Sequence, residues 1–69
     1  MDNEQRLDAQ IVLMLSLMKL GIALKDPKSE FIDKLDYIEK GFVETKDYPK
    51  LKEDINKLMT EVKEVFKLE

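Results

Sequence analysis

Hydrophobic residues recur at helical spacing in three stretches of the chain. In the last stretch the apolar positions are Leu51, Ile55, Leu58, Val62 and Val65. At about 100° per residue these positions form one stripe, with Lys and Glu residues on the opposite face. The middle stretch carries a thinner seam of the same kind, formed by Phe31, Leu35, Ile38 and Phe42. Each of these two stretches predicts an amphipathic helix that buries one side.

The first stretch differs because it carries two apolar stripes. One contains Leu7, Ile11, Met14, Met18 and Ile22. The other, roughly 100° away around the helix axis, contains Leu13, Leu17, Leu20 and Leu24. A helix that is apolar nearly all round is expected to be buried nearly all round. The second stripe therefore needs a covering surface.

Capping residues and prolines delimit the three helices. Asp2 is a suitable N-cap for the first helix, and Asp26 followed by Pro27 predicts the start of the second. Gly41 predicts the end of the second helix, because glycine adopts the left-handed conformation that terminates helices. Asp47 repeats the cap-and-proline pattern for the third. We expect one domain, 1–69, with helices over about 3–24, 27–40 and 48–67.

The expected fold is all-α: a three-helix bundle in which the first helix is long and central. The second and third helices each offer mainly one apolar stripe, so they cannot easily cover both stripes of a helix about 33 Å long. A second copy of the chain is the simplest cover, through a two-fold contact in which the stripe meets itself. We expect a homodimer or higher oligomer with Leu13, Leu17, Leu20 and Leu24 at the interface. A monomeric bundle, in which the first helix meets two neighbours, is the alternative.

Two smaller groups of residues allow two interpretations each. Small residues recur at seven-residue spacing in the first helix, namely Ala9, Ser16 and Ala23. They either permit a close approach of another helix or form a mildly polar outer face. The connection before the third helix holds Phe42, Val43 and Tyr48. These residues either pin the connection onto the end of the bundle or contact a partner.

The composition excludes most catalytic chemistry. The chain has 69 residues, a net charge of −3, and neither Cys nor His. Without Cys there is no disulfide, thiol nucleophile or zinc–thiolate site, and without His the usual general base and metal ligand is missing. The carboxylates lie among lysines on faces that are expected to be solvated. We therefore expect no catalytic, cofactor-binding or metal site, and we predict that the protein is not an enzyme.

The start of the chain and its longest apolar stretch favour a cytoplasmic protein without a membrane segment. The first residues are acidic and polar, whereas a secretory signal begins with basic residues. The apolar stretch Ile11–Leu24 is shorter than the roughly 20 residues that a spanning helix needs. It also contains Ser16 and Lys19.

These exclusions leave a small, acidic, non-enzymatic interaction protein, an adaptor, regulator or inhibitor that acts through apolar helix surfaces. One alternative is a nucleic-acid-associated regulator that uses the basic stretch Lys46–Lys57, with Tyr48 as a stacking ring. Acidic residues are interleaved with these lysines, so their field largely cancels. Nucleic acid is therefore the less favoured partner. A purely structural oligomer subunit is the other alternative.

Overall fold

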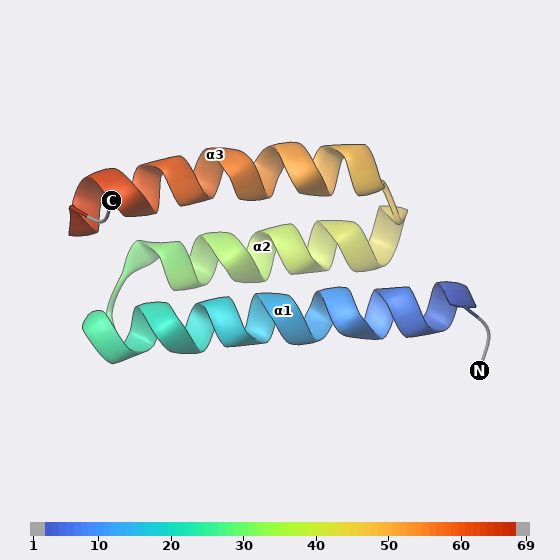
Figure 1. The fold of residues 1–69 in the computed structure, drawn as a ribbon, viewed down its shortest axis with the longest axis horizontal. Helices are drawn as coiled ribbons and strands as arrows, with labels where there is room; N and C mark the ends of the chain where they lie inside the picture. Colours follow the sequence, from blue (N-terminus) through green and yellow to red (C-terminus); the bar gives the residue numbers. More distant parts are fainter. Residues whose placement is uncertain (1–2, 68–69) are drawn as a thin grey trace.

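Residues 3–67, the part of the chain that the computed structural model describes, fold into three consecutively antiparallel α-helices (Figure 1). These are α1 (Asn3–Lys25), α2 (Glu30–Thr45) and α3 (Tyr48–Phe66). The prediction of an all-α, three-helix fold is confirmed. Asp2, the expected cap of the first helix, lies outside the described residues.

The helix at the centre is α2, and the prediction that the first helix is central is wrong. Figure 1 shows α2 between the other two helices, and α2 is the helix that packs against both. Within the described residues, α1 and α3 meet through side chains such as Asp8 and Tyr48 rather than through closely packed backbones. Because α1 has one close neighbour instead of two, more of its surface is left uncovered.

The hydrophobic core draws on one stripe from each helix. Its buried members are Leu15, Ile22, Phe31, Leu35, Phe42, Leu51, Leu58 and Val62. The rings of Phe31 and Phe66 meet edge to face, with centroids 6.1 Å apart, near the end of the bundle where α2 begins. This is a favoured aromatic geometry that adds to the burial of the two rings. The core seam of α2 is the one that the spacing predicts. That of α3 agrees except at its end, where Val65 is 61% exposed and Phe66 packs against the core instead.

The second helix starts three residues later than predicted. Ser29, not Asp26, is the N-cap, and its Oγ accepts a hydrogen bond of 3.2 Å from the backbone N–H of Phe31. The Asp26 carboxylate accepts from the N–H of Lys28 at 3.1 Å and so holds the turn between α1 and α2. Asp26 and Pro27 therefore shape a turn that precedes the helix rather than its first residues.

The second helix also runs through Gly41 and ends only at Thr45. The prediction of an end near residue 40 is wrong because packing of the whole helix outweighs the preference of one glycine. Phe42, seven residues after Leu35, lies on the same side of α2, and continuing the helix keeps it in the core. The left-handed residue that ends the helix is Lys46, with φ 53°, and its N–H donates to the Phe42 carbonyl.

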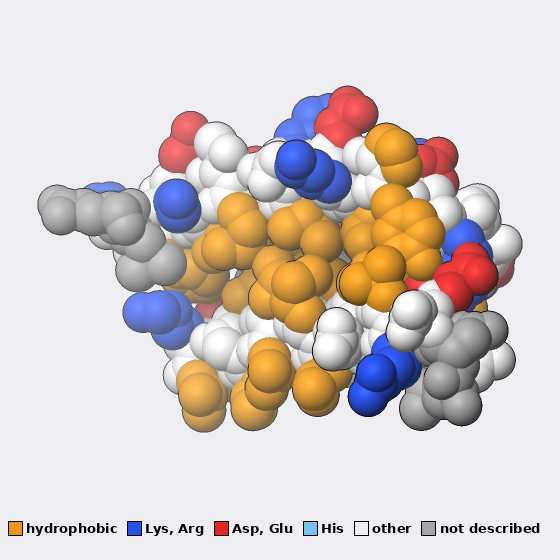
Figure 2. All heavy atoms as spheres, turned by 45° about the vertical axis from the view of Figure 1, so that its right-hand side comes forward, with side chains coloured by type: hydrophobic (Ala, Val, Ile, Leu, Met, Phe, Trp, Pro, Cys, Tyr) orange, Lys and Arg blue, Asp and Glu red, His pale blue; other side chains and the backbone are white. Residues whose placement is uncertain are grey.

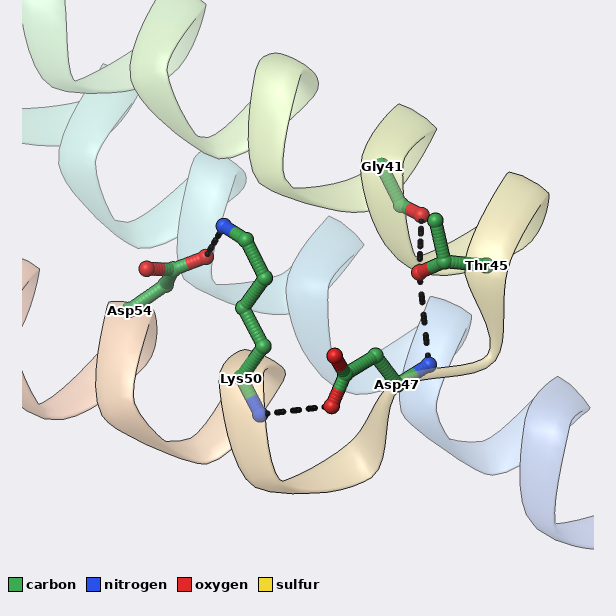
Figure 3. A network of polar contacts seen from close by, with 5 residues as sticks. All are labelled: Gly41, Thr45, Asp47, Lys50 and Asp54. Atoms are coloured by element: carbon green, nitrogen blue, oxygen red, sulfur yellow. Dashed lines mark hydrogen bonds and ion pairs between the residues drawn. The ribbon is translucent and has the colours of Figure 1, made fainter.

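The third helix begins as the sequence predicts. Asp47 is the N-cap, and its Oδ1 accepts from the N–H of Lys50 at 3.0 Å. The hydroxyl of Thr45 donates to the Gly41 carbonyl and accepts from the N–H of Asp47, as Figure 3 shows. A continuous set of hydrogen bonds therefore joins the end of α2 to the start of α3 and fixes this connection.

Candidate functional site

The candidate site is the leucine face of α1, defined as Leu13, Leu17, Leu20 and Leu24. Their side chains are between 57% and 80% exposed, whereas Leu15 on the same helix is completely buried. Leu24 follows Leu15 by nine residues, and Ile22 follows Leu13 by nine, which is two and a half helical turns. The leucine face therefore lies on the side of α1 opposite the core, and neither α2 nor α3 covers it.

The space-filling view shows this surface as a separate feature. In Figure 2 a row of hydrophobic side chains runs along the lower edge of the molecule, over α1. A larger hydrophobic area lies above it, toward α3. A shallow, open hollow on α1 is lined by Gln10, Leu13, Met14, Leu17 and Met18. The apolar surface of α1 thus extends from the leucine face around one side of the helix.

Charge is absent from the middle of this surface. Lys19 is the only charged residue from Ala9 to Leu24, and its ammonium lies 2.7 Å from the Asp36 carboxylate and 3.6 Å from that of Glu39. The hydrogen bond to Asp36 raises the pKa of Lys19 above its ordinary value. The one cation in this segment is therefore directed toward α2, away from the leucine face.

By length and composition, α1 also meets the criteria for a membrane-spanning helix. Only 11% of its most apolar 18-residue window is buried within the chain. The core of a soluble protein and a secretory signal can meet the same criteria, so this property by itself does not identify what covers α1. It does show that the surface has little polar character over most of the helix length.

The group Phe42, Val43 and Tyr48 does not form one exposed surface. Phe42 is 3% exposed, and its ring meets that of Tyr48 edge to face with centroids 5.2 Å apart. Because Phe42 is buried in the core, it is not available to contact a partner, and this part of the prediction is corrected. Val43 is half exposed and Tyr48 is partly buried. The arrangement agrees with the other interpretation, in which Phe42 and Tyr48 pin the connection to the bundle.

Asp8 completes this attachment by joining α1 to the connection. The Tyr48 hydroxyl donates a hydrogen bond to Asp8 Oδ1, and the Lys46 ammonium lies 2.8 Å from Asp8 Oδ2. The hydrogen bonds from Lys46 and Tyr48 lower the pKa of Asp8. Acceptance by Asp8, aided by burial, raises the pKa of Tyr48 to about 12. Sequence reasoning missed this contact because its partners are forty residues apart and no local pattern links them.

We predict that the Tyr48–Asp8 bond makes stability depend on pH in the alkaline range. The folded pKa of Tyr48, about 12, lies above its ordinary value of 10.0. The stabilisation is therefore complete below about pH 10 and is lost as the pH rises toward 12. Ultraviolet absorbance of tyrosinate in a Tyr37→Phe variant follows Tyr48 alone, because the chain has two tyrosines. Adding Asp8→Asn should move the midpoint down toward 10, and an unchanged midpoint would contradict the contact.

Two of the four lysines in the basic stretch Lys46–Lys57 are paired with carboxylates. Lys46 pairs with Asp8, and the Lys50 ammonium lies 3.0 Å from Asp54 Oδ2 on the next turn of α3 (Figure 3). Nucleic-acid affinity depends on free lysines and arginines that displace counterions from phosphates. With these two lysines paired, the stretch offers a weak electrostatic surface. Among residues 3–67, no group of three or more Asp or Glu side chains is placed to hold a metal ion.

Comparisons of the chain with protein-family models, with curated proteins and with solved structures found no match. The interpretation of the leucine face therefore rests on its own geometry and chemistry. These describe an apolar helix surface without charge, exposed on the side of the bundle opposite the core.

Proposed function

We propose that the protein is a non-enzymatic interaction protein that self-associates through the leucine face of α1. The observation that carries this proposal is the exposure of four leucines, at 57–80%, on the side of α1 that faces away from its own core. The only charge in the surrounding segment, on Lys19, is paired with α2. A second copy presents the same uncharged surface, so the two faces meet without repulsion between charged side chains.

The energetics support a covered rather than a solvated face. Fully burying a leucine contributes about 1.5–3 kcal/mol, so covering the exposed parts of these four contributes on the order of 4–8 kcal/mol from each chain. Association itself costs an estimated 4–15 kcal/mol in lost motional freedom. Because both copies contribute, the gain is on the order of 8–16 kcal/mol, which is comparable to this cost.

In such a homodimer the charged outer sides of α2 and α3 stay accessible. They carry exposed ion pairs, such as Lys34 with Glu61 at 3.3 Å, and the exposed ring of Tyr37. The dimer would present two copies of this surface, which suits an adaptor or regulator that acts by scaffolding or occlusion. If no other protein binds there, the assembly is a purely structural oligomer. Recovery of a stoichiometric partner by pull-down at native abundance separates these two roles.

Sedimentation equilibrium of the purified chain over roughly 1–100 μM tests the proposal. We expect the weight-average mass to rise from one chain toward two as concentration increases. A mass of one chain throughout would overturn self-association. A flotation assay with neutral phosphatidylcholine vesicles adds a second arm, because α1 meets the length criterion for a membrane span. Stable binding to vesicles at the expense of the dimer would also overturn the proposal.

A further inference from the structure

We infer that two copies pair α1 against α1 in antiparallel orientation, with Met14 of each copy packed into the open space over Gly21 of the other. This inference rests on the proposed self-association and adds its orientation and contacts. The leucines of the face follow one another at intervals of four, three and four residues, the spacing of a coiled-coil seam. In antiparallel pairing, Leu17 lies opposite the partner's Leu20, and Leu13 lies opposite the partner's Leu24.

The leucines alone do not determine whether the two α1 helices pair in parallel or antiparallel orientation, because a parallel pair would bury them too. Arg6 precedes Leu13 by seven residues and so lies on the same side of α1. A parallel pair would place Arg6 beside the partner's Arg6, which brings two like charges together at the seam. An antiparallel pair separates the two arginines and places one near each end of the seam. Charge therefore favours the antiparallel arrangement.

The residues at one edge of the leucine seam also favour the antiparallel arrangement. Gly21 follows Met14 by seven residues, so both lie at this edge. A Cβ atom added at Gly21 would meet nothing within 4 Å, and the residue has no positive φ, so the single chain shows no need for glycine here. Glycine inside a helix is destabilising relative to alanine. In the antiparallel pair, the Met14 side chain, 41% exposed in the single chain, fills this space. A parallel pair would set this edge against the partner's opposite edge, so that Gly21 would face the small residue Ser16 and the space over it would stay unfilled.

The other edge carries the small residues Ala9, Ser16 and Ala23. Small side chains let two helix axes approach closely. The Ser16 hydroxyl already donates to the Val12 carbonyl at 3.0 Å, so an interface can cover it without leaving its donor unpaired. Antiparallel pairing places Ser16 near the partner's Ala23. Both edges of the leucine face are therefore compatible with close contact to a second copy.

Disulfide trapping tests the orientation cleanly, because the chain contains no cysteine. Leu13→Cys and Leu24→Cys variants, one of them carrying a size tag, are oxidised mildly, each alone and in a 1:1 mixture. In the antiparallel pair, position 24 of one chain lies roughly 16 Å along the helix axis from position 24 of the other chain. That is beyond the Cα separation of about 7 Å that a disulfide allows. We expect the crosslink between the two different variants, the mixed crosslink, to be at least tenfold more abundant than a like crosslink, which joins two copies of the same variant. Predominant like crosslinks, or equal yields, overturn the inference.

A second variant tests the packing at Gly21. Gly21→Leu adds an apolar side chain where the single chain has open space, so the helix content should be kept or increased. In the pair it collides with the partner's Met14, and we expect the dissociation constant to rise at least tenfold. Asn56→Leu, an exposed site on α3, is the control for added hydrophobicity and should leave association unchanged. Tighter association of Gly21→Leu overturns the inference.

The two proposals fail in distinguishable ways. A wild-type chain that stays monomeric by sedimentation equilibrium contradicts self-association itself. A wild-type dimer that gives like crosslinks, or that tolerates Gly21→Leu, contradicts only the antiparallel packing. If the leucine face meets a lipid surface instead, Gly21→Leu should strengthen vesicle binding, an effect opposite in sign to the one expected for the pair.

Discussion

Leu17→Glu converts the self-associated protein into folded single chains. Leu17 is 59% exposed in the single chain, so a glutamate there remains in water and leaves the core intact. In the proposed pair, the same substitution buries two carboxylates in an apolar seam without partners, which is strongly unfavourable. We expect the dissociation constant to rise at least about 100-fold. Sedimentation equilibrium measures the mass, and circular dichroism measures the helix content.

Two matched variants separate an interface effect from unfolding. Leu15→Glu lies two residues away on the same helix, but Leu15 is completely buried, so this variant should lose its helical structure. Val65→Glu introduces the same charge at an exposed apolar position of α3, away from the leucine face. It should keep both helix content and association. If Leu17→Glu unfolds the chain as Leu15→Glu does, or sediments like the wild type, the assignment of the leucine face fails.

Leu35→Ala should remove most of the stability of the chain. Leu35 is completely buried on α2, the helix that packs against both others. Truncating a buried leucine to alanine costs about 2–5 kcal/mol through lost burial and the cavity left behind. A single domain of this size has only about 3–5 kcal/mol of net stability from its core. We therefore expect the urea midpoint to fall by about half or more.

Urea denaturation followed by circular dichroism measures this loss, at a fixed protein concentration so that any contribution of association is constant. Val65→Ala is the control, because Val65 is 61% exposed and surface truncations usually change stability by no more than about 0.5 kcal/mol. A Leu35→Ala variant with a wild-type urea midpoint would show that the core is not centred on α2.

The sequence predicts the helices well because their signals are local. The seams of α2 and α3, and the cap at Asp47, depend on residues within a few positions of one another. The surplus apolar stripe of the first helix is also visible in the sequence, but its exposure is not, because a bundle in which the first helix meets two neighbours was the alternative. The end of α2 is different. Gly41 is a sound local signal for a helix end, yet the burial of Phe42 requires the helix to continue.

Contacts between helices could not be predicted in this way. The bond between Asp8 and Tyr48, and the ion pair between Lys19 and Asp36, join residues on different helices. Nothing in their local sequence distinguishes them from other surface residues. Their pairing depends on the order in which the helices pack, and several orders satisfy the same apolar stripes.

The sequence by itself therefore determined the number and type of helices and the presence of a surplus apolar stripe on the first. These properties follow from helical periodicity and from short-range capping. Only the tertiary structure decided that α2 is central, that the leucine face lies opposite the core, and that Asp8 holds α1 to the connection. The physical reason is that the order of the helices depends on how whole helix faces fit against one another, which periodicity and capping within each helix do not specify.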